Sequence, residues 1–238
     1  MTDYSKNWVA AASDKFRLEL MPAQHKVIEA IQEPGAMVSA VATIGMGTSV
    51  LYATIVATAY LFNPGMMIWI ITDDEARLAR VKAEIHCQLI KMFINDGLHH
   101  SVASSLANDC IRNIRRKLLI TEVDPDCPEE LAGRWAEQSL YIIDNAALIS
   151  DDALAIIRTG LTEEDNRLLM VSEAHRNEGH FYDSHHKLKD LYTTVRSTSK
   201  ESTLLAPKWF DRVAGSMSPE EYRRSVLGEF PEKTANCG

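Results

Sequence analysis

The sequence is poor in cysteine and has no leader-like start. Its four cysteines, Cys87, Cys110, Cys127 and Cys237, show no C-x-x-C or other metal-binding spacing. Scattered cysteines of this kind are typical of a protein in a reducing compartment, and they exclude a disulfide-stapled secreted domain. The residues after Met1 lack the basic and apolar regions of a signal peptide.

Charge is also missing from a long internal stretch. No charged residue occurs between Pro34 and Thr72. A membrane-spanning helix needs about 20 continuous apolar residues, but Gly45, Gly47 and the turn at 63–65 interrupt this stretch. Central parallel strands are buried on both faces and are typically free of charge, so we expect no membrane association. The net charge of −8 excludes a protein whose whole surface binds nucleic acid.

Apolar runs and helix-period segments alternate along the chain after about residue 32. Short apolar runs predict strands, and helical spacing predicts helices. The predicted strands are Met37–Thr43, Met67–Thr72, Lys117–Glu122, Leu140–Asp144 and Arg167–Ser172, and the predicted helices are Thr48–Phe62, Asp74–Phe93 and Asp151–Thr159. This alternation predicts an α/β fold with a mostly parallel central sheet flanked by helices. The stretch Leu98–Gln138 is the least regular, and the last forty or so residues are expected to form a helical or extended arm.

The segment Val38–Val50 has the layout of a phosphate-binding loop: a buried strand, a glycine-bearing turn and an apolar helix. Gly47, Thr48 and Ser49 fall where the motif has Gly-Lys-Ser/Thr, with Ala42 at its first glycine. Backbone N–H groups and a hydroxyl for magnesium are present, but no Lys or Arg occurs between Lys26 and Arg77. By itself, a Gly-x-Gly turn after an apolar strand is more common in plain α/β packing than in nucleotide sites.

Three further positions carry polar groups that suit a nucleotide site. Asp144 ends an apolar strand, where nucleotide hydrolases hold magnesium, and Asn145 follows where they have a glutamate that polarises water. An amide cannot accept the proton of that water. Ser172 ends another buried strand, where a hydroxyl can sense a γ-phosphate. Gln24 precedes the first strand and could pair with adenine through its amide. Each could also be an ordinary strand-end or surface residue.

These motifs, in this order, resemble the ATPase domain of the large terminase subunit of tailed bacteriophages, the motor that drives double-stranded DNA into a procapsid. The resemblance extends from about Phe16 to Phe230, and its most specific signatures are Gly179–Tyr182 and Val226–Pro231. It implies a P-loop NTPase fold of the RecA-like (ASCE) type, ATP and magnesium as ligands, and the host cytoplasm as the location. It also implies phage terminase subunits, the portal or double-stranded DNA as partners, and an oligomer as a possible state.

The resemblance assigns a role to each of the candidate site residues. Gln24 takes the adenine-contacting position, and Asn145 the position of the catalytic glutamate. Ser172 takes the position that couples hydrolysis to motion. The nucleotide-binding residues are Ala42, Gly45, Gly47, Thr48 and Ser49, and the magnesium residues are Ser49 and Asp144. The implied organisation is an N-terminal helical region (1–32), an NTPase-like core (33–195) and a C-terminal arm (196–238) that ends where the family's nuclease domain would begin.

The departures from the family pattern predict an impaired enzyme. Thr48 replaces the loop lysine, Asn145 replaces the glutamate, and Glu173-Ala174 replaces Asn-Pro. Losing one pre-organised charged or donor group typically lowers a rate by about 10²–10³-fold. We therefore expect a pseudo-ATPase that acts by binding packaging components. One alternative is an active motor subunit whose cation comes from Arg77, Arg80, Arg134 or a neighbouring subunit. Another is an interaction protein on the same fold that binds no nucleotide.

Overall fold

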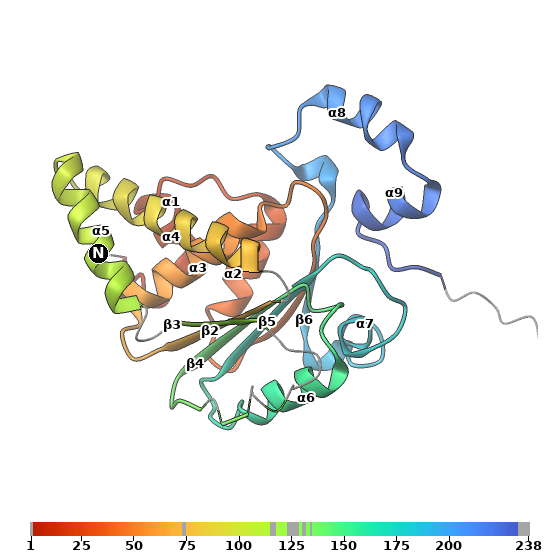
Figure 1. The fold of residues 1–238 in the computed structure, drawn as a ribbon, viewed down its shortest axis with the longest axis horizontal. Coiled ribbons are helices and arrows are strands. Elements are labelled where there is room, and N and C mark those ends of the chain that lie inside the picture. Colours follow the sequence, from red (N-terminus) through yellow and green to blue (C-terminus); the bar gives the residue numbers. More distant parts are fainter. Residues whose placement is uncertain are drawn as a thin grey trace, which may run out of the picture.

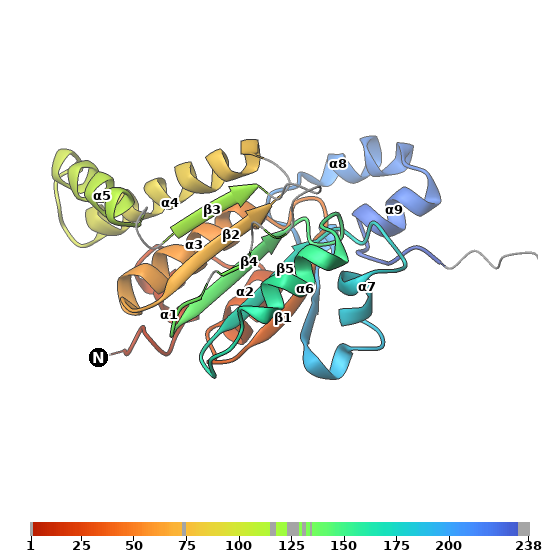
Figure 2. The same cartoon turned by 60° about the horizontal axis from the view of Figure 1, so that its bottom comes forward.

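The computed structural model describes residues 2–72, 75–114, 118–122, 129, 132–133 and 135–232. Within these residues a six-stranded sheet runs through the centre of the molecule (Figures 1 and 2), in the order β3-β2-β4-β5-β1-β6. Every pairing within it is parallel. The strands are β1 (Met37–Val41), β2 (Met67–Thr72), β3 (Leu118–Glu122), β4 (Ser139–Asp144), β5 (Arg167–Ser172) and β6 (Thr193–Arg196). The α/β fold predicted from the alternating pattern is confirmed.

Helices cover both faces of the sheet. Figure 1 shows one group above the sheet and a second group below it. The first consists of α1 (Trp8–Asp14), α2 (Pro22–Ile31), α3 (Thr48–Phe62), α4 (Glu75–Asn95) and α5 (His100–Ile114), and the second of α6 (Asp151–Thr159) and α7 (His180–Ser184). Beyond the carboxyl end of β6 lie α8 (Pro207–Arg212) and α9 (Pro219–Ser225). Among the described residues, no helix is both long enough and apolar enough to cross a membrane.

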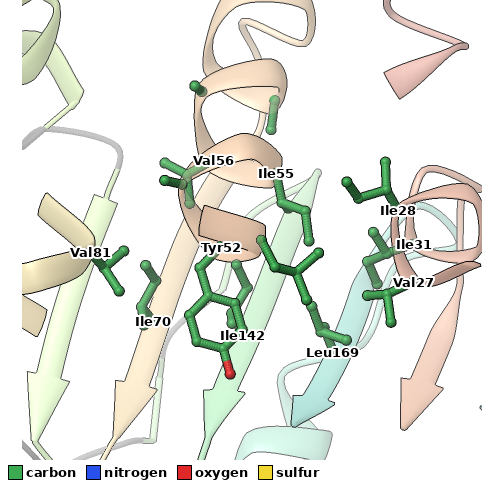
Figure 3. Close-up of a cluster of buried hydrophobic side chains, with 14 of the residues drawn as sticks. Val27, Ile28, Ile31, Tyr52, Ile55, Val56, Ile70, Val81, Ile142 and Leu169 are labelled. Atoms are coloured by element: carbon green, nitrogen blue, oxygen red, sulfur yellow. The ribbon is translucent and has the colours of Figure 1, made fainter. Parts of the chain in front are cut away.

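The larger core cluster lies between the sheet and the first group of helices. Its centre is α3, whose residues from Leu51 to Ala59 are all buried. A helix that is apolar on all sides is stable only when it is surrounded by other elements. In Figure 3 the Tyr52 ring of this helix lies among aliphatic side chains such as Ile70 and Ile142, and its hydroxyl oxygen points toward the carboxyl ends of the strands. The apolar core therefore fixes a polar atom at the edge of the sheet where the site is expected.

Most predicted elements agree closely with the structure, and the four inner strands are the four predicted to be central. The strand predicted at Met37–Thr43 ends at Val41, and the predicted ends Asp74 and Lys117 lie outside the described residues. The stretch Leu98–Gln138 was expected to be the least regular part of the chain, with a single strand, and the helix α5 within it was not predicted. The sequence of this helix has helical spacing at Val102 and Leu106, but among its described side chains only the small residues Ala103 and Ala107 are buried. The strand β6 was also not predicted, since only one of its four residues is buried.

Candidate nucleotide site

A tight turn joins β1 to α3 at the carboxyl edge of the sheet. Gly45 and Gly47 have positive φ angles of 85° and 68°, a region in which other residues are strained. A Cβ atom at Gly45 would lie 2.6 Å from the Ser202 hydroxyl oxygen. Gly47 is the N-cap of α3, which begins at Thr48, and the first N–H groups of a helix have no partner within it. The turn therefore presents backbone donors and the positive end of a helix dipole, which together favour phosphate.

The Gln24 side chain hydrogen-bonds to the backbone of this turn. Its side-chain amide is buried, and Nε2 donates to the carbonyl oxygens of Met46 at 2.9 Å and of Gly47 at 3.3 Å. Its Oε1 accepts a hydrogen bond from the Met21 backbone N–H at 3.0 Å. The structure thus places Gln24 at the loop, where its amide fixes the backbone. Contact with adenine stays a prediction.

The segment after β6 holds the other side of the turn. Ser199 Oγ donates to the Ile44 carbonyl oxygen and Ser202 Oγ to that of Gly45, both at 2.7 Å. The Ile44 N–H donates in turn to the Ser225 carbonyl oxygen at 2.9 Å. Three bonds therefore tie the phosphate-loop backbone to residues more than 150 positions away in the sequence. The C-terminal arm is part of the site's framework.

A cavity of about 290 Å³ opens between the turn and the strand ends. It brings together most of the residues that the sequence predicted for the site. The lining residues are Ala42–Val50, Arg77, Asp144, Asn145, Val171, Ser172 and Glu173. The convergence follows from the parallel sheet, because its carboxyl ends meet at one edge. Of the predicted site residues, only Gln24 contributes from behind the loop rather than from the cavity wall.

Three side chains hydrogen-bond to the Asp144 carboxylate in this cavity. The Tyr52 hydroxyl donates to its Oδ1 at 2.8 Å and the Thr72 hydroxyl to its Oδ2 at 3.2 Å. Arg77 Nη1 lies 3.1 Å from each of the two carboxylate oxygens. Burial, reinforced by the negative charge of Asp144, raises the pKa of Tyr52 well above its ordinary value. The phenol therefore stays protonated and acts as a donor to the carboxylate.

Asn145 follows Asp144 with a φ angle of 54°, in the left-handed region. Asparagine tolerates this conformation better than most residues. Its backbone carbonyl oxygen accepts a hydrogen bond from Leu148 N at 2.7 Å, which closes the turn after β4. The predicted position of the catalytic glutamate is thus a left-handed turn position at the cavity wall.

Ser172 and Glu173 form the wall opposite the loop. The Ser172 side chain is buried, and its Oγ has no hydrogen-bond partner within the described part of the chain. Its carbonyl oxygen accepts from the Ala42 N–H at 2.8 Å, which ties the end of β5 to the start of the phosphate loop. Glu173 Oε2 accepts from Ser225 Oγ at 3.2 Å and lies 3.8 Å from Arg224 Nε.

Two groups in the site were not predicted as its residues, and a third was given only as a possible source of charge. Tyr52 and Thr72 carry no signal in the sequence, because a tyrosine in a buried helix and a threonine ending a strand are common core residues. Arg77 has a weak signal, since it is the first cation after the charge-free stretch. Arg134, another suggested source of charge, lies outside the described residues, and Arg80 lines a smaller pocket next to the main cavity.

Comparison with known proteins agrees with the resemblance seen in the motifs. No protein-family model matches the chain. A curated relative, the probable terminase large subunit of Enterobacteria phage P7, is 28% identical over 96% of this chain. The match covers 49% of that relative, so the chain spans about half its length.

Solved structures of large terminases share the fold. The ATPase domain of the Thermus phage P74-26 large terminase superposes with a TM-score of 0.64 at 14% identity, covering 92% of this chain and 97% of that domain. The HK97 bacteriophage large terminase gives 0.62 at 14% identity, covering 94% of this chain and 55% of that protein. A large terminase from a thermophilic bacteriophage, solved in complex with ADP, gives 0.62 at 10% identity, covering 89% and 54%. The predicted resemblance is confirmed: over nearly its whole length the chain is similar to a phage terminase large subunit, and it shares the fold of a large-terminase ATPase domain.

Proposed function

We propose that this chain is a pseudo-ATPase of phage DNA packaging, which keeps the nucleotide-site architecture of the terminase motor but hydrolyses ATP very slowly. The observation that carries the proposal is the composition of one cavity wall. Thr48 begins α3 where the motor's loop has its lysine, and Asn145 follows Asp144 where the motor has its glutamate. Phosphoryl transfer depends on charge stabilisation and positioning, and both substitutions remove a charged group from the reaction centre.

The proposal includes the binding of a nucleotide, but it does not include the binding of magnesium by this chain. The loop offers backbone donors at the start of a 15-residue helix, and one structural neighbour was solved with ADP. A chain that binds nucleotide without fast turnover would act in the host cytoplasm through its partners. Candidates are other terminase subunits, the portal and double-stranded DNA.

The test is steady-state ATP hydrolysis at saturating Mg-ATP. We expect turnover at least about 10²-fold below that of an intact packaging ATPase, by the loss of pre-organised charge. The Asp144→Asn variant, prepared in the same way, gives the background from contaminating ATPases. Wild-type turnover within tenfold of the intact motor would overturn the proposal.

A second candidate is an active motor subunit that takes its cation from Arg77. This arginine lines the same cavity as the loop and comes from a different helix, α4. Under this candidate, fast turnover is lost in Arg77→Gln and kept in Lys82→Gln, which removes an exposed charge from the same helix. Slow ATP turnover by the wild type would exclude this second candidate.

A further inference from the structure

The Asp144 carboxylate, at the position that the fold family uses to bind magnesium, already accepts hydrogen bonds from several side chains in this chain. Oδ1 of Asp144 accepts from Tyr52 and Arg77, and Oδ2 accepts from Thr72 and Arg77. Both Arg77 contacts come from one nitrogen, so three donor groups share the two oxygens, which together offer about four lone-pair positions. Magnesium needs oxygen ligands, usually with several waters, in near-octahedral geometry. A metal or one of its waters would have to displace one of these donors and would lie beside the Arg77 cation, so the residues as arranged do not fit magnesium.

A different cation stands beside that carboxylate. The Arg77 guanidinium lies 3.1 Å from both oxygens and lines the cavity together with the phosphate loop. An arginine keeps its charge at all physiological pH values, and its planar fork of five N–H donors suits phosphate oxygens. Both contacts to Asp144 are made by a single nitrogen, Nη1. Asp144 thus holds the guanidinium of a residue that also lines the cavity.

The second acidic group of the wall is paired in the same way. Glu173 lies 3.8 Å from Arg224 and accepts a hydrogen bond from Ser225. Among the described residues that line the cavity, both carboxylates thus have an arginine beside them. This pairing reduces the repulsion that a polyphosphate would otherwise meet, and it does so without a metal ion.

We propose that this cavity binds the phosphate groups of a nucleoside di- or triphosphate without a divalent cation. Arg77 then takes the place of both the loop lysine and the metal, and Asp144 is a positioning residue that holds Arg77. The ligand class rests on the proposed function, whereas independence from metal goes beyond it. The backbone donors at the start of α3 complete the phosphate site.

The experiment is calorimetric titration of the purified chain with ATP, once with excess magnesium and once with EDTA. We expect the two Kd values to agree within about threefold. In EDTA, Arg77→Gln should weaken binding by about 10- to 100-fold, the factor for one charge-assisted hydrogen bond. The matched control Lys82→Gln removes an exposed charge from the same helix and should stay within about twofold of the wild type.

Asp144→Asn separates this inference from a hidden metal site. If Asp144 only positions Arg77, the variant keeps measurable ATP binding in EDTA and gains nothing from magnesium. If wild-type binding requires magnesium, with at least tenfold loss in EDTA, the inference is overturned while the pseudo-ATPase proposal stands. Absence of ATP binding in both buffers also overturns it. Fast turnover, in contrast, overturns the proposed function whatever the metal dependence. Should a variant fail to fold, the two wild-type titrations still decide.

Discussion

Replacing Tyr52 by phenylalanine tests how the buried carboxylate at the site is held. Tyr52 is 1% exposed and its ring packs in the centre of the core (Figure 3). The substitution keeps that ring and removes only the hydroxyl, which donates to Asp144 Oδ1 at 2.8 Å. Asp144 is itself only 4% exposed, so water is poorly placed to replace the lost donor.

The expected cost follows from the charge of the acceptor. A hydrogen bond to a charged group contributes about 1.5–3 kcal/mol, roughly twice a neutral one. We expect the free energy of unfolding of Tyr52→Phe to fall by about this amount. Tyr4→Phe is the matched control, because Tyr4 also donates to an aspartate, Asp14 Oδ2 at 3.2 Å, but on the exposed surface. Its loss should be under about 0.5 kcal/mol.

The assay is urea denaturation followed by circular dichroism, with the midpoint and slope fitted for each variant. Asp144→Asn and the double variant complete a cycle that isolates the coupling between the two side chains. A loss in Tyr52→Phe no larger than in Tyr4→Phe, or a coupling near zero, would refute the reasoning. It would mean that Arg77 and Thr72 support the carboxylate without the phenol.

Three further predictions concern the same framework. Gly45→Ala should lower the free energy of unfolding by about 1–3 kcal/mol more than the control Gly97→Ala, as measured by urea denaturation. The two glycines have similar φ angles, but a Cβ at Gly45 would lie 2.6 Å from Ser202 Oγ, whereas a Cβ at Gly97 would enter open space. Asn145→Glu should cost about 1 kcal/mol in the same assay, because a glutamate is strained at a φ of 54°. Burial lowers the pKa of His185 from 6.5 to about 4 in the folded chain. As the pH drops from about 6.5 to 4, the unfolded chain therefore binds a proton at this histidine more readily than the folded chain does, and the free energy of unfolding falls. His185→Gln should flatten that part of the stability curve, by about 1–3 kcal/mol overall.

The sheet could be predicted from sequence because its inner strands are buried on both faces. Met67–Thr72 is a continuous apolar run that ends at a polar residue, and Arg167–Ser172 is one after its first residue. The predicted bounds of both strands match the structure. The edge strand β6 and the helix α5 were not predicted from the sequence. Val195 is the only buried residue of β6, so the sequence of this strand resembles that of an exposed loop.

The sequence could predict the site residues that lie at strand ends. It could not predict the side-chain contacts between residues far apart in the sequence. Asp144 and Ser172 could be placed at one edge because parallel strands end there. The partners of Asp144 could not, because Tyr52 and Thr72 lie 92 and 72 positions away in sequence and belong to different elements. The role predicted for Gln24 illustrates the same difficulty. The sequence predicted only a contact with adenine for this residue, and its bonds to the carbonyl oxygens of Met46 and Gly47 were not predicted.

The surroundings of Asp144 explain how this site can lack its lysine and still keep a buried acid. An ionised carboxylate in the interior is strongly destabilising unless it is paired and hydrogen-bonded. In a magnesium site the metal and its waters supply that compensation, whereas here Arg77, Tyr52 and Thr72 supply it. The aspartate is then part of the fold's stability whether or not a nucleotide is bound. An acid at this strand end is therefore weak grounds for assigning a metal unless its hydrogen-bond partners are also known.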